Sequence, residues 1–393
     1  MSSWRKTLAL VLVALFLTSL VTLQPTPVKA SERSWLPMAS MPTARSGVSV
    51  AGVNGMIYAI GGSNSNSSIV GTNEMYNPNT NTWTIKASMP TPRSCFGIAV
   101  YQGKIYCVGG DIGAAKNGIL GATAVTGANE VYNPATNTWQ TKTSMPTPRM
   151  CLNANVANNE IYLIGGGISP SMYVFGSLAN NEVYDPANDS WSTKAPIPNQ
   201  MFFYASVSNG NKIYIIGGTQ DGHKGCSFNQ IYDSLTDSWT IGSPIPNIDG
   251  YVGRWGMAAG TITGNSVTSK IYLVGGIYYG YESPVFINET DVYDVARDTW
   301  ANAELPMPTF SFSGGIAALN NSLYLLGGEV KGNGELSNQN LQFALQGKAI
   351  TTTDNSPKIQ EFSTWIIPIL LTLTVTVSLL VYFKKRKAGK LIG

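Results

Sequence analysis

The chain has 393 residues, with 25 lysines and arginines, 22 aspartates and glutamates, and one histidine. Only 12% of the residues are charged, compared with about a quarter in an average soluble protein, whereas glycine, tyrosine and tryptophan are abundant. The single His223 excludes every metal site that needs two histidines. The composition favours an all-β protein with many tight turns, built as one large domain or two ordinary ones.

The N-terminal segment has the three regions of a secretory signal. Arg5 and Lys6 give a positive start, residues 7–23 form an apolar run, and the small residues that a signal peptidase requires follow at 28–30. We therefore predict that residues 1–30 are a signal peptide and that the rest of the chain is exported. Because the apolar run is long, an uncleaved membrane anchor is the alternative.

Six copies of one short pattern follow, and they are the strongest signal in the sequence. The pattern is Ile or Leu, then Tyr, two further residues and a pair of glycines, and successive copies lie 48 to 58 residues apart. A glycine pair allows the backbone to leave a crowded strand with dihedral angles that other residues avoid. The pairs are Gly61 and Gly62, Gly109 and Gly110, Gly165 and Gly166, Gly217 and Gly218, Gly275 and Gly276, and Gly327 and Gly328.

A tyrosine seven residues before a tryptophan follows each of the first five glycine pairs. We expect these aromatic side chains to fill the wedge between neighbouring sheets. The tryptophans are Trp83, Trp139, Trp191, Trp239 and Trp300, and their tyrosines are Tyr76, Tyr132, Tyr184, Tyr232 and Tyr293.

Each unit of the repeat predicts four short strands. In the second unit they are residues 95–101, 104–108, 130–133 and 138–142, and the first two are joined by the turn formers Gln102 and Gly103. Four-stranded units of this length, stacked side by side, predict a β-propeller.

These residues resemble Kelch repeats, whose signature is the glycine pair with the spaced tyrosine and tryptophan. The resemblance covers about residues 33–346 and implies a six-bladed β-propeller, which we assign to residues 31–346. The sixth unit has a third strand at residues 340–345 but no tryptophan after it, whereas Trp35 precedes the first unit. We therefore predict that an N-terminal strand within residues 33–39 completes the last blade and leaves no open sheet edge.

In such a propeller, the connections from strand two to three and from strand four to the next blade share one face. Kelch modules that bind partners usually use this face around the central channel. The long connections of this chain fall there, and long loops on a rigid frame usually carry binding. They are residues 111–128, 167–180, 219–228, 277–288 and 329–338.

The residues that begin the first strand of each unit should surround the mouth of the channel. Kelch domains that bind acidic peptides have Arg and Ser at this position, which implies a ligand role for the arginines of the first three units. The later units offer aromatic residues, and arginine forks beside aromatic faces suit an acidic peptide or a sugar. The predicted ligand-binding residues are Arg45, Arg93, Arg149, Tyr204, Tyr251, Arg254, Trp255 and Phe310.

A structural role competes for the first three arginines. Each of their units also has a glutamate at the start of the third strand, namely Glu74, Glu130 or Glu182. The two residues would then form an ion pair inside the blade, and both roles stay open. The later units lack the combination, since Asp291 has no aligned arginine. Arg254 stands outside the pattern and is therefore the favoured ligand residue.

The sequence has no convincing catalytic constellation. The copper site of galactose oxidase, which shares this type of propeller, needs two histidines, and the Ser-x-Asp-x-Gly-x-x-Trp repeat of sialidases is absent. His223 lies near Asp221 and Cys226, where an exposed loop histidine is the simplest interpretation. We therefore predict a binding module with no catalytic residue, metal or cofactor. A protein similar to the sialic-acid mutarotases, which are six-bladed Kelch enzymes, is the alternative.

Cys95 and Cys151 occupy equivalent positions in adjacent units, and Cys107 lies on a neighbouring strand. The predicted register sets Cys107 opposite Ile98, so buried small side chains are the default, although a disulfide is allowed outside the cell. Four sequons predict candidate N-glycosylation sites at Asn66, Asn188, Asn288 and Asn320.

The C-terminal region has the composition of a stalk, a membrane helix and a basic tail. Residues 347–363 form the polar stalk, residues 364–383 are apolar enough to span the ~30 Å hydrocarbon core, and residues 384–393 carry five cations. The positive-inside rule keeps this tail in the cytoplasm and predicts a single-pass cell-membrane protein with an extracellular propeller. This organisation resembles membrane-anchored surface proteins of prokaryotes. The stretch Gln360-Glu361-Phe362-Ser363 is similar to archaeal tails processed by archaeosortases, except that Ser363 replaces a proline.

The position of the charges changes the meaning of the +3 net charge. Eight basic residues and no acidic residue lie in the predicted signal and tail, which leaves 17 basic against 22 acidic residues in the exported part. This balance argues against a nucleic-acid partner. We expect an adhesion or recognition module at the cell surface, with a protein or glycan ligand at the channel mouth.

Overall fold

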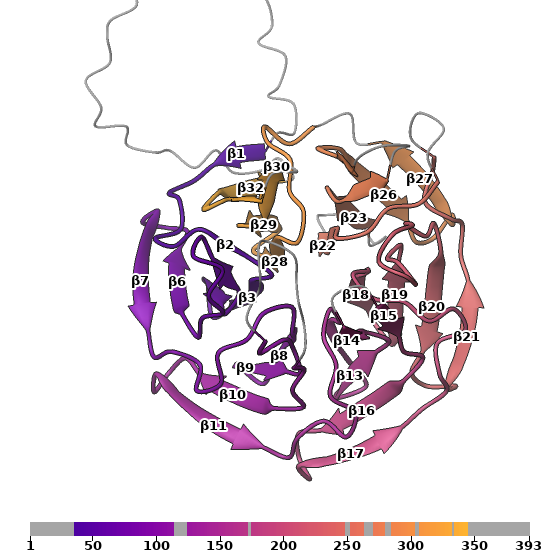
Figure 1. The fold of residues 1–393 in the computed structure, drawn as a ribbon, viewed down its shortest axis with the longest axis horizontal. Helices are drawn as coiled ribbons and strands as arrows, with labels where there is room; N and C mark the ends of the chain where they lie inside the picture. The colour runs from indigo at the N-terminus through magenta and orange to yellow at the C-terminus, as the bar shows by residue number, and fades with distance from the viewer. Residues whose placement is uncertain are drawn as a thin grey trace, which may run out of the picture. The chain divides into compact units, whose positions relative to one another are not determined.

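The computed structural model describes residues 35–113, 124–171, 174–247, 252–262, 270–279, 284–302, 306–331 and 334–344. Every regular element in these residues is a β-strand, and six four-stranded antiparallel sheets surround a central axis (Figure 1). The predicted all-β, six-bladed propeller is therefore confirmed.

The first three blades follow the chain in order. Blade 1 consists of β3 (Ser49–Val53), β4 (Met56–Ile60), β6 (Asn73–Asn77) and β7 (Thr82–Lys86). Blade 2 consists of β8 (Gly97–Tyr101), β9 (Lys104–Val108), β10 (Asn129–Asn133) and β11 (Thr138–Lys142). Blade 3 consists of β12 (Ala154–Ala157), β13 (Glu160–Ile164), β16 (Asn181–Asp185) and β17 (Ser190–Thr193).

The last three blades repeat this order, except that the final one borrows a strand. Blade 4 consists of β18 (Ala205–Asn209), β19 (Lys212–Ile216), β20 (Asn229–Asp233) and β21 (Ser238–Ile241). Blade 5 consists of β22 (Ala258–Ile262), β23 (Lys270–Val274), β26 (Thr290–Asp294) and β27 (Thr299–Asn302). Blade 6 consists of β28 (Gly315–Leu319), β29 (Ser322–Leu326), β32 (Asn340–Ala344) and the N-terminal β1 (Trp35–Pro37).

The N-terminal strand closes the propeller as predicted. Strand β1 pairs antiparallel with β32, with Trp35 opposite Phe343. The Trp35 ring lies 5.2 Å from the Phe343 ring, and its Nε1 donates a hydrogen bond to the Thr290 hydroxyl of blade 5. Trp35 is thus the tryptophan that the sixth unit lacks, supplied from the other end of the repeat.

The repeated tyrosines and tryptophans form the contacts within each blade and between neighbouring blades. Within a blade, the two residues face each other across strands three and four, as Tyr76 does with Trp83, and their ring centroids lie 5.0 to 5.1 Å apart. Each tryptophan also donates its indole N–H to a backbone carbonyl before it in the chain, as Trp139 does to Ala87 O at 2.8 Å. The predicted wedge-filling role is confirmed, and the indole hydrogen bond adds a polar contact between blades.

All six glycine pairs adopt positive φ, as the sequence predicted. At Gly61 (φ 66°), a side chain would also meet Arg93 O at 2.4 Å from its Cβ, so both conformation and space require glycine. The first strand of blade 2 begins at Gly97 rather than at Cys95, because Cys95 has a φ of 51° and cannot continue a strand.

Three of the predicted connections contain strands of their own, and a fourth two-stranded sheet lies at blade 1, outside the predicted ranges. Two-stranded sheets form from β2 (Arg45–Ser46) with β5 (Ser63–Asn64), β14 (Gly167–Ser171) with β15 (Val174–Ser177), β24 (Ile277–Tyr279) with β25 (Pro284–Phe286), and β30 (Glu329–Lys331) with β31 (Glu335–Leu336). The face that carries these connections is therefore more regular than loops alone would make it.

The predicted signal peptide, stalk, membrane helix and tail lie outside the described residues. Within the part of the chain that is described, no helix has the length and hydropathy needed to cross a bilayer.

Candidate functional site

The channel mouth is bounded by six residues, one from each blade, that we call the mouth ring. Each follows the repeat's arginine position by two residues, and all six have φ between 51° and 69°. Each backbone N–H in the ring donates to the carbonyl of the ring residue in the preceding blade, at 2.7 to 3.0 Å, and the bond from Gly47 N to Ser313 O closes the circle. The mouth ring consists of Gly47, Cys95, Cys151, Phe203, Gly256 and Ser313.

A cavity of about 80 Å³ lies at the mouth ring and is lined by residues of all six blades. This volume holds a few water molecules and is too small for a peptide or a sugar ring. The residues that line it include Ser49, Asn153 and Ser313, as well as Cys95 and Cys151. A larger ligand would therefore have to contact the connections around the mouth rather than enter the channel.

The predicted mouth arginines are fully buried inside their blades. Arg45, Arg93 and Arg149 have no exposed surface, and each forms an ion pair at 2.5 to 2.8 Å with the glutamate of its own blade. Desolvation by burial lowers the pKa of Arg45 from its ordinary value, although Glu74 opposes this shift. The geometry supports the structural interpretation that the sequence had left open.

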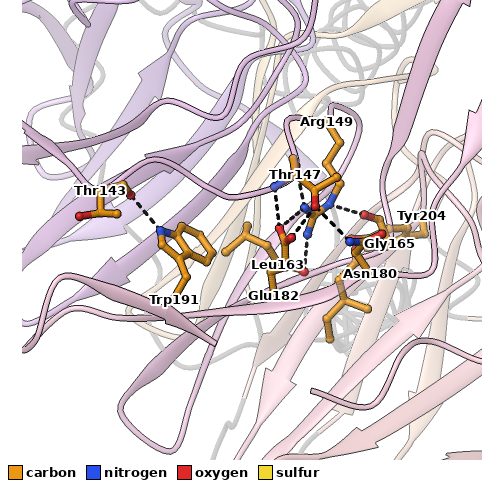
Figure 2. Close-up of polar contacts among 10 residues, drawn as sticks. Thr143, Thr147, Arg149, Leu163, Gly165, Asn180, Glu182, Trp191 and Tyr204 are labelled. Carbon is orange, nitrogen blue, oxygen red and sulfur yellow. Dashed lines mark hydrogen bonds and ion pairs between the residues drawn. The ribbon is translucent and has the colours of Figure 1, made fainter. Parts of the chain in front are cut away.

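Blade 3 shows the arrangement in full (Figure 2). The Arg149 guanidinium donates to the carbonyls of Gly165, Leu163 and Thr147 at 2.7 to 2.9 Å, as well as to Glu182 Oε2 at 2.5 Å. Glu182 Oε1 accepts a 2.6 Å hydrogen bond from the Thr147 hydroxyl. The pair therefore joins the entry to blade 3 with the ends of β13 and the start of β16.

Arg254 belongs to the same set, which corrects the sequence interpretation. It is 2% exposed, and its Nη2 pairs with the carboxylate of Asp291, the residue that had been expected to have no aligned arginine. Five extra residues between Pro246 and Arg254 hid the alignment. A signal was present in the sequence, because Arg254-Trp255-Gly256-Met257 repeats the form of Arg45-Ser46-Gly47-Val48.

The remaining predicted mouth residues have different environments. Tyr204 is buried, and its hydroxyl donates to Ile164 O. Trp255 is also buried and lies in an aromatic group with Phe203 and Phe312, at ring separations of 5.1 to 6.1 Å. Phe310 is 40% exposed, and Tyr251 lies outside the described residues. The ligand role of these residues stays a prediction.

Two carboxylates directly after glycine pairs were not singled out by the sequence. Asp111 is 1% exposed, pairs by backbone with Ser94, and accepts a side-chain hydrogen bond from Gly113 N. Burial raises the pKa of Asp111 to about 6, and burial also raises the pKa of Glu329, at the same position of blade 6. Their only signal in the sequence is the position directly after a glycine pair. This position was assigned to the long connections 111–128 and 329–338, so it did not draw attention to the two carboxylates.

The other predicted sites are on the surface or carry local bonds. His223 is exposed, and its backbone N–H donates to Asp221 Oδ1. Among the sequons, Asn66, Asn188 and Asn320 are exposed, while Asn288 donates its amide to Met307 O. Glycosylation of these residues stays a prediction. Among the described residues, no cluster of three or more His, Cys, Asp or Glu side chains could hold a metal ion.

The blades, glycine pairs and tyrosine–tryptophan contacts define a six-bladed propeller built from Kelch-type repeats. The Kelch motif model matches residues 44–90, 92–146, 148–198 and 202–246, which together make up half of the chain. The chain therefore belongs to the Kelch-repeat family.

Curated relatives share part of this region. Kelch-like protein 36 of Mus musculus is 27% identical over 219 residues, covering 53% of this chain and 32% of the relative. Beta-scruin of Limulus polyphemus is 33% identical over 93 residues, covering 23% of this chain and 10% of the relative. The matches thus span about a third or less of these relatives.

A solved structure described as the structure of YjhT has the same fold. It aligns with a TM-score of 0.66 at 18% identity, and the alignment covers 79% of this chain and 98% of the other. At this identity, the likeness concerns the fold alone.

Proposed function

We propose that this chain is a non-catalytic binding or adhesion module that holds a protein or glycan ligand on the mouth face of its propeller. The observation that carries the proposal is the division of that face into a rigid base and a structured rim. The four arginine–carboxylate pairs and the mouth ring form the base. The two-stranded sheets stand on that base, and connections held on a rigid frame are suited to recognition.

The chemistry of the rim differs from one side to the other. Blades 4 to 6 contribute the aromatic group of Phe203, Trp255 and Phe312, and the exposed Phe310 lies two residues before Phe312 in the sequence. Blade 1 contributes partly exposed polar side chains, among them Ser46 and Asn64 of its two-stranded sheet. Aromatic faces beside hydrogen-bonding groups match a sugar or the side chains of a peptide.

The proposed setting is the cell surface. The predicted signal at residues 1–30, the apolar segment at 364–383 and the basic tail support an extracellular propeller with a membrane anchor. The acidic balance of the exported part supports a ligand other than nucleic acid.

The test is a glycan and peptide array probed with the purified full-length chain. We expect selective binding that Phe310→Ala reduces at least tenfold, because its ring is exposed at the rim, and that His223→Ala leaves unchanged. A chain that binds nothing selectively, or that binds equally well after both substitutions, would contradict the proposal.

A second candidate is an epimerase similar to the sialic-acid mutarotases, which are six-bladed Kelch enzymes, because this chain has the same number of blades. A carboxyl with a pKa of about 6, such as that of Asp111, can exchange a proton near neutral pH. The enzyme would accelerate the interconversion of sialic-acid anomers, measured by NMR, and Asp111→Asn would abolish the acceleration. Catalysis of this kind would replace the binding-module proposal.

A further inference from the structure

Two of the chain's four cysteines are neighbours in the mouth ring. Cys151 N donates to Cys95 O at 2.7 Å, so blade 3 bonds directly to blade 2 at these residues. With standard covalent dimensions, this bond limits the distance between the two Cα atoms to at most about 6.6 Å. Disulfides have Cα separations of about 4.4–6.8 Å, so the backbone already satisfies the requirement for a cross-link.

Both cysteine side chains point along the ring toward the preceding blade, so the Cys151 side chain points toward Cys95. A Cβ atom placed on Gly47 would lie 3.0 Å from Cys95 Sγ, so the Cys95 side chain is directed at the ring residue of the preceding blade. Cys151 is placed relative to Cys95 as Cys95 is placed relative to Gly47. In both cases the cysteine N–H donates to the carbonyl of the preceding ring residue, and the φ angles of the two cysteines are nearly the same. The Cys151 sulfur is therefore directed at Cys95. Burial, together with the Cys95 thiol, raises the pKa of Cys151 well above its ordinary value.

The pair is accessible from the mouth, in contrast to the chain's other buried thiol. Cys95 and Cys151 both line the cavity at the mouth ring, and Cys95 is only half-buried. Cys107 has no exposed surface and faces Ile98 in the strand register, as the sequence predicted. Cys226 pairs by backbone with Arg254, which directly precedes blade 5.

We propose that Cys95 and Cys151 are an oxidisable pair that forms a disulfide between blades 2 and 3 on contact with a small-molecule disulfide such as oxidised glutathione. The Cys95 thiolate attacks one sulfur of the reagent, whose S–S bond breaks and releases the first glutathione thiolate. Cys151 loses its proton to solvent and attacks the Cys95 sulfur, which releases the second glutathione. Two protein thiols are oxidised, and one glutathione disulfide is reduced to two thiols.

The cross-link would act on the mouth itself. It would lock two adjacent members of the mouth ring, bridge residues 56 apart in the sequence and remove two thiol hydrogens from the cavity lining. The oxidised chain should therefore resist thermal unfolding better than the reduced one, because its unfolded state is constrained.

Trypsin separates the four cysteines and so gives a direct test. Cleavage places Cys95 in residues 94–104, Cys107 in 105–116, Cys151 in 150–194 and Cys226 in 225–254. The full-length chain is incubated with oxidised glutathione, its free thiols are alkylated, and it is digested without reduction. We expect mass spectrometry to show peptide 94–104 linked to 150–194, with the mass of both peptides less two hydrogens, and to lose this species on reduction.

Variants separate the two steps. Cys151→Ser should leave Cys95 as a stable mixed disulfide with glutathione, whereas Cys107→Ser should form the linked peptides at the wild-type rate. The proposal is overturned if the wild-type chain keeps both thiols alkylated after oxidation, or if Cys95 or Cys151 pairs mainly with Cys107 or Cys226. The outcome is independent of whether the mouth binds a ligand.

Discussion

Blades 3 and 4 are adjacent and have the same strand arrangement, yet the same buried pair of positions is charged in blade 3 and uncharged in blade 4. Blade 3 holds Arg149 and Glu182 as an ion pair, whereas blade 4 holds Met201 and Gln230. Gln230 bonds to the backbone of Asn199 through both its oxygen and its nitrogen, at 2.8 and 3.0 Å, and its Nε2 lies 3.6 Å from Met201 Sδ. A neutral amide therefore makes the connection to the incoming chain that the carboxylate of Glu182 makes in blade 3.

The backbone explains why both solutions are accepted. The carbonyl of the residue at the arginine position accepts a hydrogen bond from the N–H of the second glycine of the pair in a neighbouring blade, and this bond measures 2.9 to 3.0 Å in all six blades. Blade 6 keeps it with Ser311 in place of an arginine. Because the contact is made by the main chain, the side chain is free to vary as long as its buried polar groups are satisfied. The arginine side chains are thus one of several ways to fill a buried position of the blade.

The largest expected effect follows from breaking one pair. Glu182→Gln leaves Arg149 charged and buried without a counter-ion, and it should lower the free energy of unfolding by about 3–5 kcal/mol. Urea denaturation followed by tryptophan fluorescence measures this loss. Glu160→Gln in the same blade is the control, since Glu160 is only partly buried, and it should cost less than about 1 kcal/mol. Equal losses in the two variants would show that the pair has no special role.

A smaller effect is expected in blade 5. Arg254 donates to Asp291, but its Nε and Nη1 have no partner among the described residues, whereas all three nitrogens of Arg149 are bonded. Arg254→Met leaves the buried Asp291 carboxylate without its partner but removes only one side-chain hydrogen bond, so it should cost about 3 kcal/mol, at the low end of the range expected for Glu182→Gln. The same denaturation series checks the order, and a larger loss for Arg254→Met would reverse it.

Asp111 provides a buried carboxylate for comparison with the paired ones. Burial raises its pKa to about 6, above the value of the unfolded chain, so folding favours the protonated form. The contribution of the protonated Asp111 carboxyl to the free energy of unfolding is fully present below about pH 4. It is lost as the pH rises to about 6, which lowers the free energy of unfolding by roughly 2 kcal/mol. Asp111→Asn should remove this part of the pH dependence. Parallel pH profiles of unfolding for the two proteins would contradict the assignment.

The smallest effect concerns the turn between strands three and four. Blade 3 has Asp189 where blade 2 has Asn137, and each side-chain oxygen accepts a hydrogen bond from the tyrosine five residues before it, Tyr184 or Tyr132. The hydrogen bond from Tyr184 lowers the pKa of Asp189 in the folded protein. The Asp189 carboxylate therefore adds to the free energy of unfolding above the pKa that this residue has in the unfolded chain, and the addition is lost as the pH falls. Asp189→Asn should reduce the change in the free energy of unfolding between pH 3 and 6 by less than about 0.5 kcal/mol, which thermal unfolding over this pH range measures. A larger change would contradict the similarity of the two turns.

The sequence was sufficient for the fold because the fold depends on local repeats. The glycine pairs, the tyrosines and the tryptophans recur at fixed distances from each other, so each unit predicts its own strands. Even closure by Trp35 could be predicted, because a sixth unit without its tryptophan leaves one specific place to fill. These features depend on spacing alone.

The site was harder to predict because it depends on which side chains are buried. Sequence alone cannot distinguish an arginine that faces the mouth from one that turns into its blade, and the insertion before Arg254 hid its partner Asp291. The mouth ring was missed because its members share a backbone conformation rather than a residue type, ranging from Gly47 to Phe203. Pattern matching on residue identity does not detect such a feature.

The central claim is that the arginine–glutamate pair is one of two interchangeable ways to fill the blade. Replacing blade 3's pair with blade 4's residues, as Arg149→Met combined with Glu182→Gln, tests it most directly by urea denaturation. The double variant should recover most of the loss caused by Glu182→Gln and lie within about 1.5 kcal/mol of the wild type. A double variant as unstable as Glu182→Gln alone would contradict the claim.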